Sequence, residues 1–179
     1  YRLEQITLPT YPYASYLSSV IDPALGGYAL RVLDRAEYEA SEPRPAPVTY
    51  DLLVLENDYL RLSILPALGG RVYECVFKAT GNNEFYRNPV IKPTNWGPPA
   101  SDYPVGANWW LGVGGLEWGF PVEEHGYEWG SAWSHAVANL PDDGVSVTLS
   151  TGSAAGPHVS VTITLSPDSA AFTVQPRIT

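Results

Sequence analysis

The chain has 179 residues, a formal net charge of −9 and 45% hydrophobic residues. This length suits one domain with a sizeable core, and the hydrophobic content disfavours a disordered chain. The acidic balance disfavours nucleic acid and anionic membranes as partners, because both attract a basic face, but it is compatible with a neutral ligand. No apolar run approaches the roughly 20 residues of a membrane helix, so we expect no membrane insertion.

The N-terminal quarter of the chain predicts an arm with one short helix. The segment Tyr28–Ala40 carries apolar residues at helical spacing and follows two glycines. A Pro-rich segment comes directly after it and has the composition of an exposed linker. We therefore expect an N-terminal strand or arm over residues 1–47 and a β-domain over residues 48–179.

Strand signals dominate the rest of the chain. Polar and apolar residues alternate, with many β-branched side chains, in Tyr59–Leu65, Gly144–Ser150 and His158–Ser166. A period of two indicates strands that are half-buried in an antiparallel sheet. The sequence therefore predicts an all-β fold, either an antiparallel β-sandwich or a barrel.

Turn residues between these runs predict hairpins. The turn Thr80–Asn83 should fold Arg71–Lys78 back on Glu84–Arg87, and Val159–Leu165 should pair with Ala171–Val174. The last run stays strand-like up to the final residue, so we expect a C-terminally truncated piece of a longer protein. An open sheet edge at that strand would allow a homo-oligomer to form by strand pairing.

The single cysteine, Cys75, excludes an intrachain disulfide. The run Val72–Phe77 alternates in a way that puts Cys75 on the same side as Tyr73 and Phe77. A free cysteine among aromatic side chains is typically a small buried hydrophobe. We therefore expect no reactive thiol here.

All six tryptophans fall between Trp96 and Trp133, and two of the three histidines, His125 and His135, lie within this stretch or directly after it. This stretch has few alternating runs and many glycines and prolines, which is typical of a long functional loop. Indole faces stack on the C–H bonds of a sugar ring, while carboxylates and imidazoles bind its hydroxyls. The sequence therefore predicts carbohydrate as the ligand and a site within residues 108–135.

Two side chains are candidates for catalysis, His125 and Glu117. A neutral imidazole donates and accepts protons near physiological pH, which suits work at a sugar oxygen. A glutamate in a pocket would have a raised pKa, as acid–base catalysis requires. We expect one or two tryptophans to face the ligand and the others to pack. The candidate substrate-binding residues are Trp109, Trp118, Trp129, His135 and Arg71.

Each candidate also has a simpler structural explanation. His125 and Glu117 would be solvated loop side chains, His135 a hydrogen-bonded structural histidine and Arg71 part of a salt bridge at a strand edge. Glu128 follows His125 by three residues and could orient its ring. These groups match no zinc signature, so we expect neither a metal nor a cofactor.

Two stretches together resemble the galactose mutarotase-like (aldose 1-epimerase-like) superfamily. Leu55–Pro93 contains a Glu-Asn strand and then the motif LPALGGR, and Gly114–Trp133 contains a Gly-rich loop that leads to His125-Gly126-Tyr127. The resemblance implies a partial supersandwich from a bacterial branch of carbohydrate-associated proteins, with sugar on the concave face. It also implies that His125 binds sugar oxygens. On physical grounds, Gly69 and Gly70 allow positive φ and a bulge that bends one strand into the next.

The chain departs from this superfamily at two points. The glutamate that acts there as general base lies in a C-terminal half that this chain does not match. The sugar-binding Asn-Arg-Ile motif also has no counterpart, because Glu117 and Trp118 stand where it would be expected. We therefore predict a carbohydrate-binding domain of a bacterial sugar- or polysaccharide-processing protein, with no complete enzyme in this chain alone.

Two alternatives stay open from the sequence. One is an aldose epimerase or glycoside-processing enzyme that needs further C-terminal residues. The other is a structural or interaction module that packs its Trp-rich face on a partner. The composition, rich in Tyr, Trp and Pro and poor in Lys, is more typical of an extracellular or periplasmic protein than of a cytosolic one.

Overall fold

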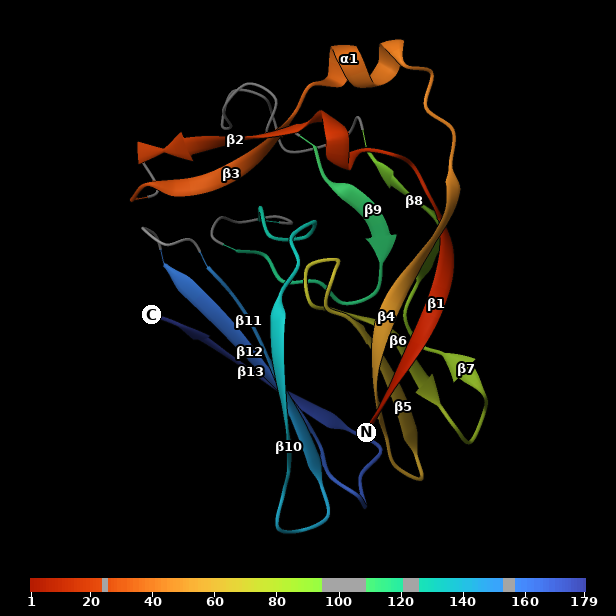
Figure 1. The fold of residues 1–179 in the computed structure, drawn as a ribbon. Helices are drawn as coiled ribbons and strands as arrows, with labels where there is room; N and C mark the ends of the chain where they lie inside the picture. Colours follow the sequence, from red (N-terminus) through yellow and green to blue (C-terminus); the bar gives the residue numbers. More distant parts are fainter. Residues whose placement is uncertain (24–25, 95–108, 121–125, 153–156) are drawn as a thin grey trace.

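The computed structural model describes residues 1–23, 26–94, 109–120, 126–152 and 157–179, and most of these belong to β-strands (Figure 1). The large sheet has the order β7-β6-β5-β4-β1-β8-β9, with β1 at Arg2–Thr10, β4 at Ala46–Glu56, β5 at Leu60–Leu65, β6 at Arg71–Phe77, β7 at Asn82–Asn83, β8 at Arg87–Pro93 and β9 at Leu111–Gly114. The small sheet has the order β10-β11-β12-β13, with β10 at Ser134–Asn139, β11 at Val145–Gly152, β12 at His158–Leu165 and β13 at Phe172–Ile178. A separate hairpin joins β2 at Leu17–Asp22 to β3 at Tyr28–Leu33, between the 3-10 turn Ala14–Tyr16 and the helix α1 at Arg35–Ala40.

The N-terminal strand lies inside the large sheet. β1 pairs antiparallel with β4 over nine positions, from Arg2 opposite Val54 to Thr10 opposite Ala46. On its other side β1 meets β8 in parallel, where Thr10 lies opposite Ile91. All other strand pairs of the described sheets are antiparallel. Residues 1–47 thus supply a central strand of the sheet that carries the later elements.

The predicted helix over Tyr28–Ala40 is wrong for its first half. Tyr28 and Leu30 are buried two residues apart in β3, and this alternation belongs to a strand. The helix α1 begins only after Asp34, whose carboxylate accepts the backbone N–H of Glu37 at 2.9 Å. An aspartate followed three residues later by a glutamate is a helix N-cap pattern, and here it separates strand from helix.

The three alternating runs are strands β5, β11 and β12, as the sequence predicts. β12 also pairs with β13 as predicted. The chain after β6 folds back on it as predicted, but the pairing begins earlier along the chain, at Asn82 and Asn83, and Glu84 follows by donating its backbone N–H to the Cys75 carbonyl at 2.8 Å. The side chain of Asn83 accepts the backbone N–H of Cys75 at 2.9 Å, which closes the turn earlier along the chain.

Two apolar layers flank the large sheet. The small sheet packs on one face, where its buried side chains Val147, Leu149, Val161 and Ile163 meet those of β4, β5 and β6. The other face is covered by the 3-10 turn, α1 and two tryptophans. The fold is therefore all-β, with two sheets packed face to face.

A β-bulge changes the side on which β6 side chains lie. The pairing with β5 shifts between Ser63 opposite Glu74 and Ile64 opposite Val72, so Tyr73 is the extra residue. Val72 and Cys75 consequently face the small sheet, while Tyr73 faces the other apolar layer. Cys75 is buried as predicted, but it does not share a side with Tyr73.

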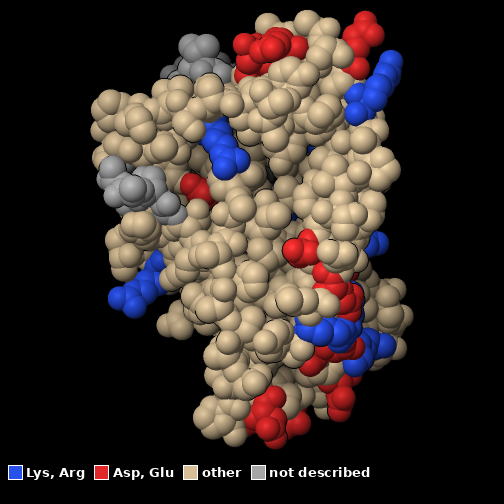
Figure 2. Space-filling view, in the orientation of Figure 1, with Lys and Arg blue, Asp and Glu red and all other residues tan. Residues whose placement is uncertain are grey.

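Charged side chains gather over β1, β4, β5 and β6, where Figure 2 shows blue and red atoms interleaved at the lower right. They form ion pairs across the strands, including Arg61 with Glu4 at 2.7 Å and Lys78 with Glu56 at 3.1 Å. Much of the same face carries no charge. Among the described residues, no helix is both long and apolar enough to span a bilayer.

Candidate functional site: an aromatic cavity at the β8–β9 edge

A cavity of about 340 Å³ lies at the β9 edge of the large sheet. Its wall combines two aromatic side chains with a carboxylate, an amide and a run of glycines. The described lining residues are Tyr86, Asn88, Thr94, Trp110, Leu111, Gly112, Val113, Gly114, Gly115 and Glu117. This is a mixture of flat apolar surfaces and polar groups typical of small-ligand sites.

One side of the cavity is the outer face of β9, which carries glycines. Leu111 and Val113 point into the core, with 1% exposure each, so the intervening positions face the opposite side of the strand. These positions are Gly112 and Gly114, which carry no side chain. A Cβ on Gly112 would lie 3.2 Å from the amide nitrogen of Asn88. At Gly112 the outer face of β9 therefore carries no side chain, whereas a Cβ on Gly114 would lie 2.4 Å from the Tyr86 backbone oxygen, so Gly114 allows the close approach of the two chain segments.

Trp110 and Tyr86 supply the aromatic surfaces. The backbone of Trp110 is fixed by Thr94, whose N–H and hydroxyl both donate to the Trp110 carbonyl, at 2.8 and 3.2 Å. Trp110 is half-buried, whereas Tyr86 is 74% exposed. The two rings therefore lie at a cavity that is open to solvent on the Tyr86 side.

Asn88 places an amide inside the cavity. Its Nδ2 donates to the carbonyl of Val90 at 2.6 Å and to that of Gly112 at 3.3 Å. The Tyr86 hydroxyl lies 3.4 Å from the Asn88 Oδ1, which is a long hydrogen bond. An amide oxygen held in this way can accept a stronger bond from a ligand hydroxyl.

A buried arginine lies behind the carboxylate of the cavity. Arg71 is 1% exposed, and its guanidinium donates to the carbonyl oxygens of Leu68 at 2.7 Å, Gly114 at 3.0 Å and Trp129 at 2.9 Å. Its Nη1 also lies 3.2 Å from a carboxylate oxygen of Glu117. Burial lowers the pKa of Arg71, and the charge of Glu117 opposes that effect. Arg71 therefore joins three segments and fixes Glu117, while a ligand cannot reach it.

The other candidate tryptophans pack in the interior. Trp109 and Trp129 meet edge to face with ring centroids 4.3 Å apart, and both are buried. Trp118 is half-buried and donates its indole N–H to the Gly70 carbonyl at 3.1 Å. The cavity tryptophan, Trp110, was absent from the predicted set. Neighbouring residues of an extended segment face opposite sides. If Trp109 packs in the interior, Trp110 must therefore face outward, and this could have identified it as a candidate.

His135 does not line this cavity. His135 is exposed on β10 of the small sheet, opposite Leu149. His125 lies outside the described residues. Within the described ranges, no group of three or more His, Cys, Asp or Glu side chains could hold a metal ion.

The turn before Arg71 has the positive-φ backbone that its two glycines predict. Gly69 and Gly70 have φ values of +76° and +59°, in the region that glycine adopts most easily. A Cβ on Gly69 would lie 2.8 Å from the Trp129 backbone, so the Trp-rich segment packs directly on this turn.

Glu128 provides a pH-dependent test of the packing near Trp129. Its carboxyl is buried and accepts the Thr151 hydroxyl at 3.0 Å, and burial raises its pKa. The folded protein then holds a proton more tightly than the unfolded chain, so stability should fall as pH rises from the ordinary glutamate pKa towards the raised one. We expect Glu128→Gln to remove this part of the pH dependence in urea unfolding at pH 4 to 8. An unchanged profile in the variant would contradict the assignment.

The fold and the cavity define this chain as an all-β domain with an aromatic, partly polar cavity at one sheet edge. The chain belongs to the family described as Domain of unknown function (DUF5107), whose model matches residues 31–177.

A solved structure shares the fold. The chain is similar to a TPR-domain containing protein from Parabacteroides distasonis ATCC 8503, with a TM-score of 0.73 and 22% sequence identity. The match covers 99% of this chain and 28% of that protein, so the chain spans a minor part of its length. At this level of identity the likeness concerns the fold alone.

Proposed function

We propose that this chain is a carbohydrate-binding domain and that a sugar binds in the β8–β9 cavity. The observation that carries the proposal is the placement of Trp110 and Tyr86 beside Asn88 and Glu117, over strand positions without side chains. Aromatic rings contact the C–H faces of a sugar, and amide and carboxylate oxygens accept its hydroxyls.

The electrostatics favour a neutral sugar. Glu117 is the carboxylate that lines the cavity, and its arginine partner is buried out of reach of a ligand. Among the described lining residues, an anionic ligand would therefore meet an acidic group and no cationic side chain. The volume of about 340 Å³ lies near the lower end of the range for ligand sites, which favours a terminal sugar or a short glycan.

The ion pair also favours binding over catalysis. A carboxylate fixed by a guanidinium accepts hydrogen bonds from hydroxyls, whereas a general acid must give up a proton. The resemblance to the galactose mutarotase-like superfamily supports the same class of ligand. In this proposal the domain serves a longer bacterial protein that processes sugars or polysaccharides, and that protein's chemistry lies in other residues.

The proposal is tested by titration calorimetry with a panel of neutral mono- and oligosaccharides. The variants are Trp110→Ala and Tyr86→Ala, and the matched control is Tyr59→Ala, an exposed tyrosine outside the cavity lining. We expect saturable binding to the native protein and a loss of about tenfold or more in each cavity variant, because truncating an aromatic anchor typically costs more than 1 kcal/mol. The control should bind normally.

Equal affinity in native protein and cavity variants would overturn the site. A folded native protein that binds none of the panel would overturn the function. Because Tyr86 is 74% exposed, its variant keeps the test meaningful if Trp110→Ala disturbs the fold.

A further inference from the structure

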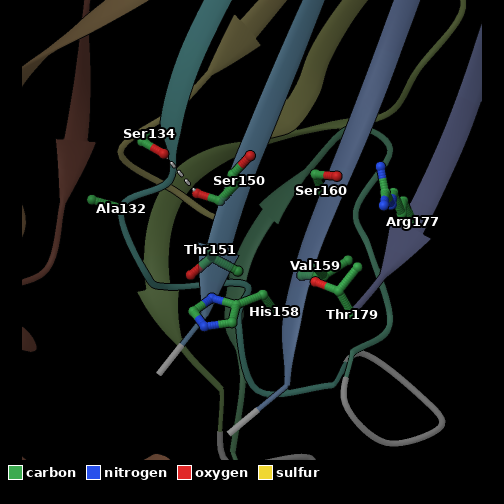
Figure 3. A pocket seen from close by; sticks show the side chains of 9 residues that line it. All are labelled: Ala132, Ser134, Ser150, Thr151, His158, Val159, Ser160, Arg177 and Thr179. Carbon is green, nitrogen blue, oxygen red and sulfur yellow. Dashed lines mark hydrogen bonds between the residues drawn. The ribbon is translucent and has the colours of Figure 1, made fainter. Parts of the chain in front are cut away.

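A second, larger cavity of about 640 Å³ lies on the small sheet (Figure 3). Its floor is formed by side chains from all four strands of that sheet. Figure 3 shows Ser134, Ser150, Ser160 and Arg177 following one another across the sheet, with His158 near Thr151 at one end. None of these groups takes part in the β8–β9 cavity, and the two cavities share no described lining residue.

Strand register explains why these groups line up. Ser134 pairs with Ser150, Ser150 with Ser160, and Ser160 with Arg177. Paired positions on neighbouring strands are about 4.8 Å apart and point to the same face. This face is opposite to the one that buries Leu149 and Val161. The result is a row of short hydroxyl side chains that ends in a guanidinium.

The charge of the cavity is unusual for this protein. The chain has 19 acidic and 10 basic residues, yet the described residues that line this cavity include Arg177 and His158 and no aspartate or glutamate. Arg177 also forms no ion pair with any described residue, in contrast to Arg61, which pairs with two carboxylates. A cation and an imidazole beside hydroxyl groups, in a hollow whose described lining has no aspartate or glutamate side chain, match an anionic and hydroxylated ligand.

A buried carboxyl, that of Glu128, is bonded to one of the lining residues. Thr151 donates its hydroxyl to Glu128 at 3.0 Å, so that hydroxyl is occupied by the protein. Burial raises the pKa of Glu128, which favours its uncharged form. The Ser134 hydroxyl is likewise bonded to the Ser150 carbonyl at 3.1 Å. Ser150, Ser160, His158 and Arg177 are the groups that a ligand would meet.

We propose that the small-sheet cavity binds an acidic sugar, a hydroxylated ring that carries a carboxylate. The Arg177 guanidinium takes the carboxylate through paired N–H donors. The hydroxyls of Ser150 and Ser160 and the imidazole of His158 bond to the ring hydroxyls. This site goes beyond the neutral-sugar site of the large sheet and does not depend on it.

The test is titration calorimetry of the full chain with galacturonate, galactose and inorganic phosphate. The variants are Arg177→Gln and His158→Gln, and the matched control is Arg44→Gln, an exposed arginine elsewhere that changes the net charge equally. We expect galacturonate to bind more tightly than galactose or phosphate, and Arg177→Gln to weaken it by about tenfold, the usual effect of losing a charge-assisted hydrogen bond. His158→Gln should weaken it less, and the control should bind normally.

Three outcomes would overturn this site. Equal binding of galacturonate and galactose would remove the role of the carboxylate, and tighter binding of phosphate would indicate an anion site without sugar recognition. Unchanged galacturonate binding in Arg177→Gln, with circular dichroism showing an intact fold, would remove the role of Arg177. The Trp110→Ala variant separates the two proposals, because it should lose neutral-sugar binding and keep galacturonate binding.

Discussion

Replacing Arg71 with methionine should lower the free energy of unfolding by about 3–5 kcal/mol, the usual cost of breaking a buried ion pair. Methionine matches much of the arginine stem but leaves the carbonyl oxygens of Leu68, Gly114 and Trp129 without their donor. Each buried carbonyl without a partner costs about 1–3 kcal/mol. The relief from no longer burying a charge offsets only part of this loss.

Urea unfolding followed by tryptophan fluorescence measures the effect. Arg44→Met is the matched control, because this exposed arginine should change stability little. Arg71→Lys should be intermediate, since an ammonium keeps the charge but cannot reach three carbonyls in the same fork geometry. A near-native midpoint for Arg71→Met would show that Arg71 does not hold the Trp-rich segment to the β5–β6 turn.

Replacing Gly115 with alanine should have a comparable effect, about 3 kcal/mol or more. Gly115 has a φ of +78°, where a side chain costs about 1–2 kcal/mol by itself. Its Cβ would also lie 2.4 Å from the backbone oxygen of Val72, which cannot move without shifting β6. Crowding of this kind typically adds about 1–3 kcal/mol.

Gly81→Ala is the control that separates these two contributions. Gly81 has a similar φ of +73°, but no atom lies within 4 Å of its Cβ position. Thermal unfolding should therefore show a small loss for Gly81→Ala and a much larger one for Gly115→Ala. Equal losses would mean that the contact between the β9 end and β6 is looser than the structure has it.

Strands are predicted best from the sequence where the alternation of apolar and polar residues is the only signal. Strands β11 and β12 follow a simple apolar–polar period, because one face of each is buried and the other is solvated. The helix over Tyr28–Ala40 was wrong because the apolar residues of β3 also fit a helical spacing. The capping pattern at Asp34 resolves this ambiguity, since it marks where the helix begins.

The bulge at Tyr73 is another feature that the alternation of residues does not predict. A local alternation cannot show that one extra residue shifts the register, because the shift depends on how β5 pairs with β6. Only tertiary structure separates Tyr73 from Cys75.

The sequence predicted which segment contributes to the candidate site, but not which residues line it. The enrichment of aromatic residues points to the segment that contains Trp110 and Glu117, and both line the cavity. Tyr86 and Asn88 come from β8 and its approach, and only the pairing of β8 with β9 brings them there. From sequence, Arg71 was a candidate for substrate binding or for a salt bridge at a strand edge, and its burial follows from contacts with segments more than 40 residues away.

The central claim is that a neutral sugar binds in the β8–β9 cavity, and amide chemical-shift mapping tests it most directly. Heteronuclear spectra of the labelled protein would be recorded with and without a saturating neutral sugar from the calorimetric panel. The account predicts that the largest shifts fall on the amides of Gly112, Gly114 and Gly115 and on the indole N–H of Trp110. Shifts confined to the small sheet, or no shifts in a folded sample, would contradict it.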